Sequence, residues 1–372
     1  MNISVIGGGN LGSLIAANLS LVSGVKVTIW TSKPEKFSGR FLVTDKEKGI
    51  EYKSAEINIT DQAKVAVSDA DLIFCTVPSF AYESYILQIN PYIKKSALLG
   101  FVPGSGGAEF LCRKLMHESV VIFGLQRVPY ICRNIKYGEI CGCNSTRNML
   151  FAASIPSSKI KYVCDLMKRL FNIPCTALHN FLELTLVPSN AILHTSRLYQ
   201  MFHLSDNCLY ANNPYFYYDW NNEASELLLS CDNELQIICQ AFGELNLSGI
   251  VSLKEYYEVV TATQLTEKMK SIPAFRDILS PMVERSPGNW EPDWQSRYFK
   301  EDFPYGLAVI KGFANIVEVH TPVIDEILQW YQKISGEEYF SLSGKAGKDI
   351  GHCGAPQRYG FQQKSQIISL YK

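Results

Sequence analysis

The sequence predicts an N-terminal α/β domain built on a doubly wound parallel sheet, followed by a mostly α-helical domain. Three observations support this fold class. Short apolar segments alternate with segments of helical spacing from Met1 to about Phe151, a glycine-rich turn follows the first apolar segment, and helical spacing dominates from Glu183 onward. The 372 residues are long for one core and sufficient for two domains.

The predicted strands of the first domain are short and apolar. The segment at 70–77 contains DLIFCTV, a continuous apolar run typical of a parallel strand covered on both faces. The strands are expected at 2–6, 25–30, 70–77, 97–102 and 120–125, with a helix at 11–22. Strands that alternate with helices imply right-handed crossovers and a parallel sheet.

The second half has helical apolar spacing, for example at Glu226–Phe242 and Pro322–Ile334. Breakers separate these segments at Asn212–Pro214, Ser286–Gly288 and Phe303–Gly306. We place the boundary near 173–185 and assign residues 1–175 and 176–372 to the two domains. The segment Ser343–Gly360 is rich in glycine and polar residues and is expected to be a long loop or a partly ordered tail.

Composition excludes several classes of protein. Apolar residues make up 47% and charged residues 19%, which argues against a disordered chain. The net charge of −1 gives no generic attraction to nucleic acid or to an anionic membrane. No apolar stretch approaches the roughly 18–20 residues of a membrane-spanning helix, and the start lacks the basic segment of a signal peptide. We therefore expect no nucleic-acid and no membrane partner.

The eleven cysteines are odd in number and irregularly spaced, and Cys141 and Cys143 form the only close pair. There is no CxxC motif to begin a zinc site. We interpret most of them as buried thiols in a reducing compartment, predict a cytoplasmic protein, and assign no metal site.

The strongest motif is a GxGxxG pattern formed by Gly7, Gly9 and Gly12, with Asn10 and Leu11 inside it. In a strand–turn–helix setting the first glycine permits the tight turn, the second lets the backbone approach a pyrophosphate, and the third allows helix and strand to pack closely. The amides at the helix N-terminus then face the phosphate charge. A dinucleotide-binding Rossmann domain is the prediction, and a purely structural turn is the alternative.

The end of the second strand bears on the choice of cofactor. NAD sites usually place an acidic residue there for the ribose hydroxyls, but this chain has Thr31, Ser32 and Lys33, with Glu35 the nearest acid. Two hydroxyls and a cation suit a 2′-phosphate, so we favour NADP over NAD. The alternative is that these residues form a solvated turn.

Two later strands end in turns that could also meet the cofactor. One continues into Val77 and Pro78, and the next leads to Gly104 in a glycine-rich loop. Ligands bind at the carboxyl ends of strands in open α/β sheets, and a glycine there permits close approach of a nicotinamide ring. Tight turns alone are the alternative.

One segment of the helical half combines an amide, an imidazole and a guanidinium. Asn190, His194 and Arg197 share a helix face at i, i+4 and i+7. A histidine titrates near neutrality and can serve as a general acid or base. A second polar cluster, at Arg297–Gly306, contains Asp302, whose carboxylate could orient an imidazole. A core histidine and an ordinary helix-end charge cluster are the alternatives, and the sequence does not place Asp302 beside His194.

Together these segments resemble the octopine/nopaline (opine) dehydrogenase family, within the 6-phosphogluconate dehydrogenase-like two-domain oxidoreductases. The matching segments are VIGGGNLG at the N-terminus, Gln126–Arg133 (QRVPYICR), Asn190–His194 (NAILH) and Arg297–Gly306 (RYFKEDFPYG). The last two are the specific ones, because glycine fingerprints occur in many dehydrogenases.

The resemblance implies an NAD(P)H-dependent reductive condensation of an α-keto acid with the amino group of an amino acid. It implies that His194 is the acid/base and that Asp302 holds and polarises its imidazole. The expected partners are small-molecule substrates, with a homodimer as a possible assembly. The candidate substrate-binding residues are Asn190, Arg297, Arg133 and Tyr130. Arg297 is favoured as the bidentate carboxylate clamp over Arg133 and Arg197, and the aromatic run 215–220 is a candidate pocket lining.

Two alternatives stay open. One is a 2-hydroxy-compound oxidoreductase of the ketopantoate reductase or glycerol-3-phosphate dehydrogenase type, which places a lysine at the catalytic position of the helical domain. The matched helix, 188–199, contains no lysine. The other is a non-catalytic protein that senses a dinucleotide.

Overall fold

The computed structural model describes residues 1–116, 119–204 and 210–371. The chain divides into two compact units: residues 1–185 together with Tyr371 form unit 1, and residues 186–370 form unit 2. The division lies later than the predicted boundary at 175/176. The reason is that strand β12 (Cys175–Ala177) pairs in parallel with β11 (Leu150–Ile155), which keeps this segment in the sheet of unit 1.

Unit 1 contains an eight-stranded sheet in the order β12-β11-β8-β7-β6-β1-β2-β5. Its pairs are parallel except that β11 runs antiparallel to β8. The remaining strands are β1 (Asn2–Ile6), β2 (Lys26–Trp30), β5 (Asn58–Thr60), β6 (Leu72–Cys75), β7 (Leu98–Phe101) and β8 (Val121–Leu125). The doubly wound sheet is confirmed, and the chain order reverses between β1 and β6, where such sheets bind ligands.

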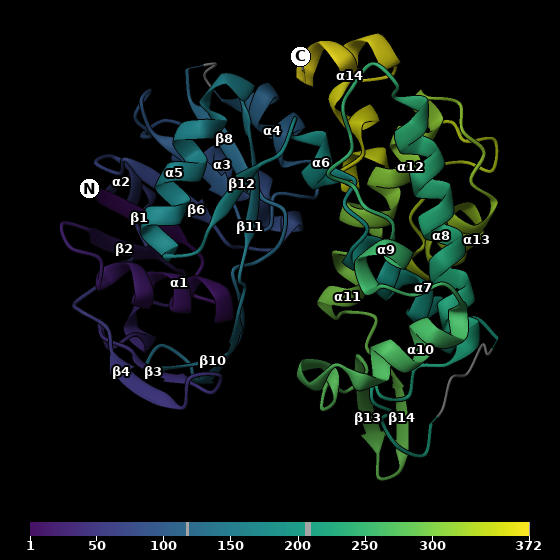
Figure 1. Cartoon of the computed structure of the whole chain (residues 1–372), viewed down its shortest axis with the longest axis horizontal. Helices are drawn as coiled ribbons and strands as arrows, with labels where there is room; N and C mark the ends of the chain where they lie inside the picture. The colour runs from purple at the N-terminus through teal and green to yellow at the C-terminus, as the bar shows by residue number, and fades with distance from the viewer. Residues whose placement is uncertain (117–118, 205–209, 372) are drawn as a thin grey trace. The chain divides into compact units, whose positions relative to one another are not determined.

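Helices cover both faces of this sheet (Figure 1). Helix α1 contacts α5 on one face, and α3 contacts α2 and α4 on the other. The helices are α1 (Asn10–Ser20), α2 (Ala63–Val67), α3 (Tyr82–Ile89), α4 (Ala108–Leu115), α5 (Ile160–Phe171) and α6 (Leu182–Thr185). Leu14, Ile15 and Leu19 of α1 are fully buried, so this helix is fixed by the core beneath it.

A second, four-stranded sheet in unit 1 was not predicted. Its order is β4-β3-β10-β9. The strands are β3 (Leu42–Asp45), β4 (Ile50–Lys53), β9 (Tyr130–Lys136) and β10 (Ile140–Thr146). Its central pair, β3 with β10, joins segments far apart in sequence, and β4 is largely exposed. A strand with little burial and a distant partner leaves a weak local pattern.

Unit 2 is mostly helical and is organised around α8 (Asn222–Ala241), which contacts α7, α10, α12 and α13. The other helices are α7 (Asn190–Phe202), α9 (Leu253–Tyr257), α10 (Ala262–Ser271), α11 (Arg297–Lys300), α12 (Ala308–Ile316), α13 (Pro322–Ser335) and α14 (Lys364–Tyr371). The predicted helices at 226–242 and 322–334 correspond to α8 and α13. A hairpin of β13 (Met282–Ser286) and β14 (Asn289–Pro292) turns at Gly288, in the left-handed region.

The segment Ser343–Gly360 is a long loop, as one of the two expectations had it, with short 3-10 turns at Ile350–His352 and Pro356–Tyr359, and it is packed against the rest of unit 2 rather than forming a partly ordered tail. Cys353 and Ala355 are fully buried, and the Gln357 side-chain amide donates to the Gly312 carbonyl of α12 at 2.7 Å. A Cβ on Gly312 would lie 2.8 Å from Pro356. A glycine in α12 therefore makes room for this segment, a fit that glycine content alone does not reveal.

Most cysteines of the described residues are buried. The ten cysteines in the described ranges are free thiols and seven are buried, as predicted, while Cys208 lies outside the described residues. The reducing compartment stays a prediction. Across the described residues, no helix combines the length and the apolar character that crossing a membrane requires.

Candidate active site

The glycine turn of unit 1 is held in place by backbone and side-chain contacts. Gly7 has φ +102°, and its N–H donates to the Trp30 carbonyl at 3.0 Å. A Cβ on Gly12 would collide with the Gly7 carbonyl oxygen. The Thr76 hydroxyl donates to the Ile6 carbonyl at 2.8 Å. Gly7 and Gly12 are therefore required by the protein's own packing, whatever binds here.

Gly9 differs from the other two motif glycines. It is exposed, and no atom lies within 4 Å of the position that its Cβ would take. It is also the N-cap of α1, where no side chain accepts a hydrogen bond from the first-turn amides. Open space in front of uncapped amides fits an anionic group such as a pyrophosphate. Gly9 and the first-turn amides of α1 therefore fit the predicted nucleotide site.

Asn10 and Leu11 support the turn from within unit 1. The Asn10 side-chain oxygen accepts from the Asn134 backbone N–H at 2.8 Å, which ties α1 to β9. Leu11 packs against the hydrophobic core. Both residues therefore position the turn, and their contact with a cofactor stays a prediction.

The predicted ribose-end residues follow β2, the sheet neighbour of β1. Thr31 is buried, and its hydroxyl accepts from the Lys33 N–H at 3.3 Å. Ser32 and Lys33 are exposed. A hydroxyl and an ammonium group are thus available to solvent at the carboxyl end of β2, where Glu35 is the nearest acid in sequence.

Val77 and Pro78 follow β6 at the neighbouring strand end. A Cβ on Gly7 would lie 2.8 Å from Val77, so Val77 packs directly on the turn. Gly104, by contrast, is buried, and a Cβ there would lie 2.7 Å from the Gly124 Cα and 3.0 Å from Leu184. Packing within unit 1 therefore explains why residue 104 is a glycine, and its contact with a cofactor stays a prediction.

In unit 2, the structure brings together the two residues of the predicted acid/base pair. His194 lies on α7 and is 7% exposed. Its Nδ1 is 2.8 Å from Asp302 Oδ2, and its Nε2 is 2.9 Å from the Tyr217 hydroxyl. Asp302 lies just before a π-helical turn at Phe303–Leu307. Both ring nitrogens of His194 therefore have hydrogen-bond partners.

Aromatic rings enclose this imidazole. The ring of Tyr298 lies 4.5 Å from it at 33°, and Phe216 meets it edge-on at 5.5 Å. The Tyr217 ring stacks on Phe275 at 4.2 Å. Apolar surroundings exclude water and strengthen the charge interaction between His194 and Asp302.

Arg197 has a structural role that its sequence position did not suggest. It is 4% exposed, and its Nε and Nη2 donate to the carbonyls of Phe216 and Asp219. Its guanidinium lies over the Trp220 ring at 5.5 Å. Burial lowers the pKa of Arg197 to about 10, which leaves it charged at neutral pH. Arg197 therefore anchors the 215–220 segment, and its candidacy as a carboxylate clamp is not supported.

The other candidate substrate residues of unit 2 are solvent-accessible. Asn190 is the first residue of α7 and is exposed. The Arg297 side chain is 68% exposed and forms an ion pair with Glu301 one helical turn along, with Nε 2.9 Å from Oε2. Either side chain can meet a ligand from solvent, and their roles stay predictions.

The remaining two candidates belong to unit 1. Arg133 is exposed on β9. Tyr130 is 5% exposed, belongs to the hydrophobic core, and packs near Phe171. Burial raises its pKa. Tyr130 is therefore packed in the core of unit 1, and its role as a substrate contact stays a prediction.

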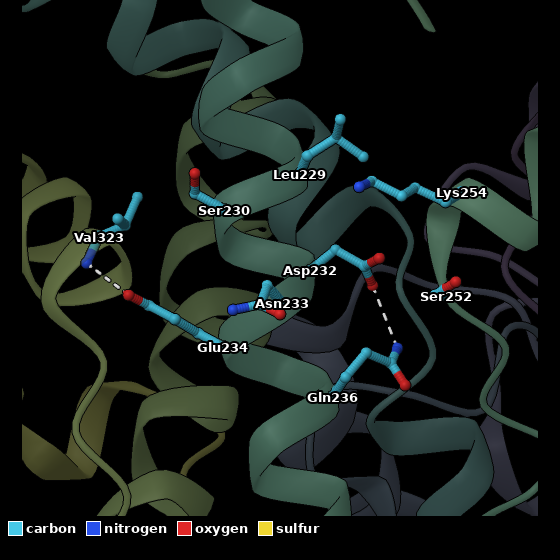
Figure 2. Close-up of a pocket in the computed structure, with 9 residues that line it drawn as sticks. All are labelled: Leu229, Ser230, Asp232, Asn233, Glu234, Gln236, Ser252, Lys254 and Val323. Atoms are coloured by element: carbon cyan, nitrogen blue, oxygen red, sulfur yellow. Dashed lines mark hydrogen bonds between the residues drawn. The ribbon is translucent and has the colours of Figure 1, made fainter. Parts of the chain in front are cut away.

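A hollow of about 480 Å³ lies beside α8, and no predicted site residue belongs to its lining. Figure 2 shows the residues that line it. Its lining consists of Leu229, Ser230, Asp232, Asn233, Glu234, Gln236, Ser252, Lys254 and Val323. Asp232 accepts from the Leu253 N–H at 2.7 Å, and Glu234 accepts from the Val323 N–H at 2.8 Å. These carboxylates cap the N-termini of α9 and α13, so their placement has a structural explanation.

Sequence reasoning missed two side chains that contact predicted site groups. Tyr217 meets His194, and Thr76 holds the glycine turn. Tyr217 lies within the aromatic run 215–220, but nothing in the sequence of this run distinguishes one tyrosine from another. Thr76 precedes Val77 at a strand end, which is the only sequence signal for it.

Comparison with known families agrees with this division into a nucleotide unit and a helical unit. Residues 177–335 match the family model for the alpha-helical domain of NAD/NADP octopine/nopaline dehydrogenase. Residues 3–129 match the family model for ketopantoate reductase PanE/ApbA. The two matches divide the chain as the fold does, into a Rossmann-like unit and a helical unit, and each unit is similar to a domain of known two-domain oxidoreductases.

Full-length relatives narrow this class. The chain is 28% identical to opine dehydrogenase from Haliotis discus hannai, covering 100% of this chain and 99% of that one. It is 26% identical to tauropine dehydrogenase from Arabella iricolor, covering 98% and 99%. A solved structure of octopine dehydrogenase with NADH and L-arginine has a TM-score of 0.88 at 26% identity, covering 99% and 98%. The resemblance to the octopine/nopaline dehydrogenase family is confirmed.

Proposed function

We propose that this chain is an NAD(P)H-dependent opine-type dehydrogenase, which condenses an α-keto acid with the amino group of an amino acid and reduces the resulting imine. The observation that carries the proposal is the buried His194–Asp302 pair, at 2.8 Å, on the helical unit that matches this family. The reaction needs a hydride source and a proton donor. The nucleotide site of unit 1 would bind the hydride source, and His194 of unit 2 would be the proton donor.

The nucleotide site of unit 1 would be formed by the glycine turn and the ends of β2 and β6. Gly9 leaves the space and α1 the amides for a pyrophosphate, and Ser32 and Lys33 would meet the ribose end. When bound, the reduced nicotinamide supplies the hydride. We favour NADP over NAD because an exposed ammonium and hydroxyl suit a 2′-phosphate better than a diol.

His194 acts as the general acid and base. With the Nδ1 proton donated to Asp302, the tautomer is fixed and Nε2 is the nitrogen that takes up and gives back a proton. Attack of the amine on the keto carbon creates an alkoxide that needs a proton, and loss of water needs a second one. The Asp302 carboxylate stabilises the imidazolium that forms between these steps.

The substrate carboxylate would be bound by Arg297, whose exposed guanidinium can form two parallel hydrogen bonds. Arg297 already pairs with Glu301, whose side chain is 19% exposed, so a substrate carboxylate would share the guanidinium with Glu301 or displace it. Asn190, at the start of the helix that carries His194, is the second proposed substrate contact. Arg133 on unit 1 is the alternative carboxylate ligand.

The test is a screen of NADPH and NADH oxidation over pairs of keto acids and amines, with His194→Ala beside the wild type. We expect oxidation that requires both substrates, and loss of most turnover in the variant with cofactor binding retained. Oxidation with a keto acid alone would indicate a 2-hydroxy-acid dehydrogenase, an interpretation that the ketopantoate reductase match of residues 3–129 keeps in consideration. Nucleotide binding without oxidation would indicate a sensor. The homodimer and the cytoplasmic location stay predictions.

A further inference from the structure

The Nε2 atom of His194 is already occupied by a protein group. The Tyr217 hydroxyl lies 2.9 Å from it, and Asp302 lies 2.8 Å from Nδ1 on the other side of the ring. An imidazole that donates from Nδ1 accepts at Nε2, so the Tyr217 O–H points at His194. Tyr217 is 5% exposed and His194 is 7% exposed. The ring nitrogen that should exchange a proton with the substrate is therefore hydrogen-bonded to the Tyr217 hydroxyl.

The imidazole has little freedom to turn away from this phenol. Tyr298 lies against its face at 4.5 Å, and Phe216 packs on it edge-on at 5.5 Å. The bond to Asp302 fixes the ring from the opposite nitrogen. Since an N–H group makes one strong, nearly linear hydrogen bond, a proton on Nε2 is directed at the Tyr217 oxygen.

The Tyr217 side chain is also fixed in position by its neighbours. Its ring stacks on Phe275 at 4.2 Å and 18°, and lies parallel to Trp220 at 7°. Arg197 fixes the backbone on both sides of it, by donating to the carbonyls of Phe216 and Asp219. A charged residue that is nearly fully buried thus secures a short segment in which Tyr217 is the residue that meets His194. Such rigidity suits a group that must be placed within hydrogen-bond reach of a reacting atom.

We propose that Tyr217 is a catalytic residue of the condensation, relaying the proton between His194 Nε2 and the substrate oxygen. This rests on the proposed function and adds a residue to it. In the dehydration step, the Tyr217 O–H proton moves to the hydroxyl of the carbinolamine. The C–O bond breaks, water leaves, and the nitrogen lone pair forms the C=N bond.

The same step restores the phenol. The imidazolium Nε2–H proton moves to the Tyr217 oxygen as that oxygen gives up its own proton, which leaves His194 neutral and Tyr217 unchanged. No free tyrosinate forms, because the proton that Tyr217 gives up is replaced in the same step. Asp302 stabilises the charge at the far end of the relay before the transfer.

Tyr217→Phe tests the relay, because it keeps the ring stack and removes the hydroxyl. We expect kcat to fall at least about 100-fold, as for loss of a general acid, with NAD(P)H binding unchanged and a larger solvent deuterium isotope effect as proton transfer becomes limiting. Tyr256→Phe is the matched control, since it removes a phenol oxygen from an exposed tyrosine of unit 2 that belongs to no proposed site. It should behave as wild type.

The outcomes separate the relay from the proposed function. If the wild type turns over, His194→Ala does not, and Tyr217→Phe keeps wild-type kcat and isotope effect, the relay is overturned and the proposed function stands. If the wild type oxidises NAD(P)H with no substrate pair, both are overturned. Should Tyr217→Phe fail to fold, 3-fluorotyrosine at position 217 keeps the stack and acidifies the phenol. A shifted pH profile of kcat then supports the relay, and an unchanged profile overturns it.

Discussion

Asp302 Oδ2 lies 2.8 Å from His194 Nδ1, although 108 residues separate them in sequence. The pair is largely buried, with the two side chains 9% and 14% exposed. A carboxylate in this position selects one imidazole tautomer and stabilises the imidazolium. The sequence offered both residues as candidates, and the fold of unit 2 brings α7 and the π-helical turn together to join them.

Replacing Asp302 with asparagine should therefore lower kcat about 10²–10⁴-fold, because the amide can offer its NH₂ to Nδ1 and stabilise the wrong tautomer. Cofactor binding should be retained, since unit 1 is unchanged. Steady-state kinetics at saturating substrate measures this. Asp277→Asn makes the same chemical change at an exposed residue and should have no effect. An Asp302→Asn enzyme with wild-type kcat would remove Asp302 from the mechanism.

The features that were predictable from sequence are those fixed by local patterning. The strand at Asn2–Ile6, the glycine turn after it and the helix carrying His194 all follow from apolar spacing and turn chemistry within a few residues of each position. The parallel pairing of the strands follows from their alternation with helices. These rules alone are enough to place Gly7 at the carboxyl end of a strand.

What was missed depends on packing between distant segments. Arg197 and Tyr130 have the residue types of a binding site, but each is buried by neighbours that spacing does not identify. The β3–β10 pairing joins the two hairpins of the small sheet across a long sequence separation. Tyr217 became distinguishable from Tyr215 and Tyr218 only through its contact with His194.

The motif glycines allow a test that separates folding from ligand binding. Gly12→Ala places a methyl against the Gly7 carbonyl oxygen and 2.6 Å from the Thr76 hydroxyl, so we expect unit 1 to lose about 1–3 kcal/mol of stability or more. Gly9→Ala meets no protein atom and should unfold like the wild type, but bind NAD(P)H at least about tenfold more weakly, or 1.4 kcal/mol. Thermal unfolding and nucleotide fluorescence titration report the two effects. Unaltered binding by Gly9→Ala would argue against a pyrophosphate at this turn.

The NADP preference is testable at the exposed end of β2. Ser32→Asp introduces a carboxylate that repels a 2′-phosphate and accepts hydrogen bonds from a ribose diol. We expect the ratio of kcat/KM for NADPH to that for NADH to fall at least about tenfold, since a misplaced like charge costs more than 1 kcal/mol. Lys33→Ala should weaken the binding of NADPH more than the binding of NADH. Lys36→Ala, at another exposed lysine, is the control. Equal losses of kcat/KM for NADPH and NADH would contradict the assignment of NADP as the preferred cofactor.

Glu109 of unit 1 should make stability depend on pH. It is fully buried, and its Oε1 accepts from the hydroxyls of Thr185 and Tyr371, the latter at 2.9 Å. Its Oε2 has no hydrogen-bond partner among the described residues. Burial raises the pKa of Glu109 from 4.5 to about 7. The folded state therefore binds this proton more tightly than the unfolded state does.

The sign of the effect follows from this raised pKa. The stabilisation is fully present below about pH 4.5 and is lost as the pH rises through about 7, a difference of roughly 3 kcal/mol at 1.36 kcal/mol per pKa unit. Glu109→Gln should remove this dependence and be more stable than the wild type at pH 8. Denaturant unfolding at pH 5 and pH 8 measures it, with Glu56→Gln, an exposed residue, as the matched control. If wild type and Glu109→Gln lose equal stability between these pH values, Glu109 does not titrate in this range.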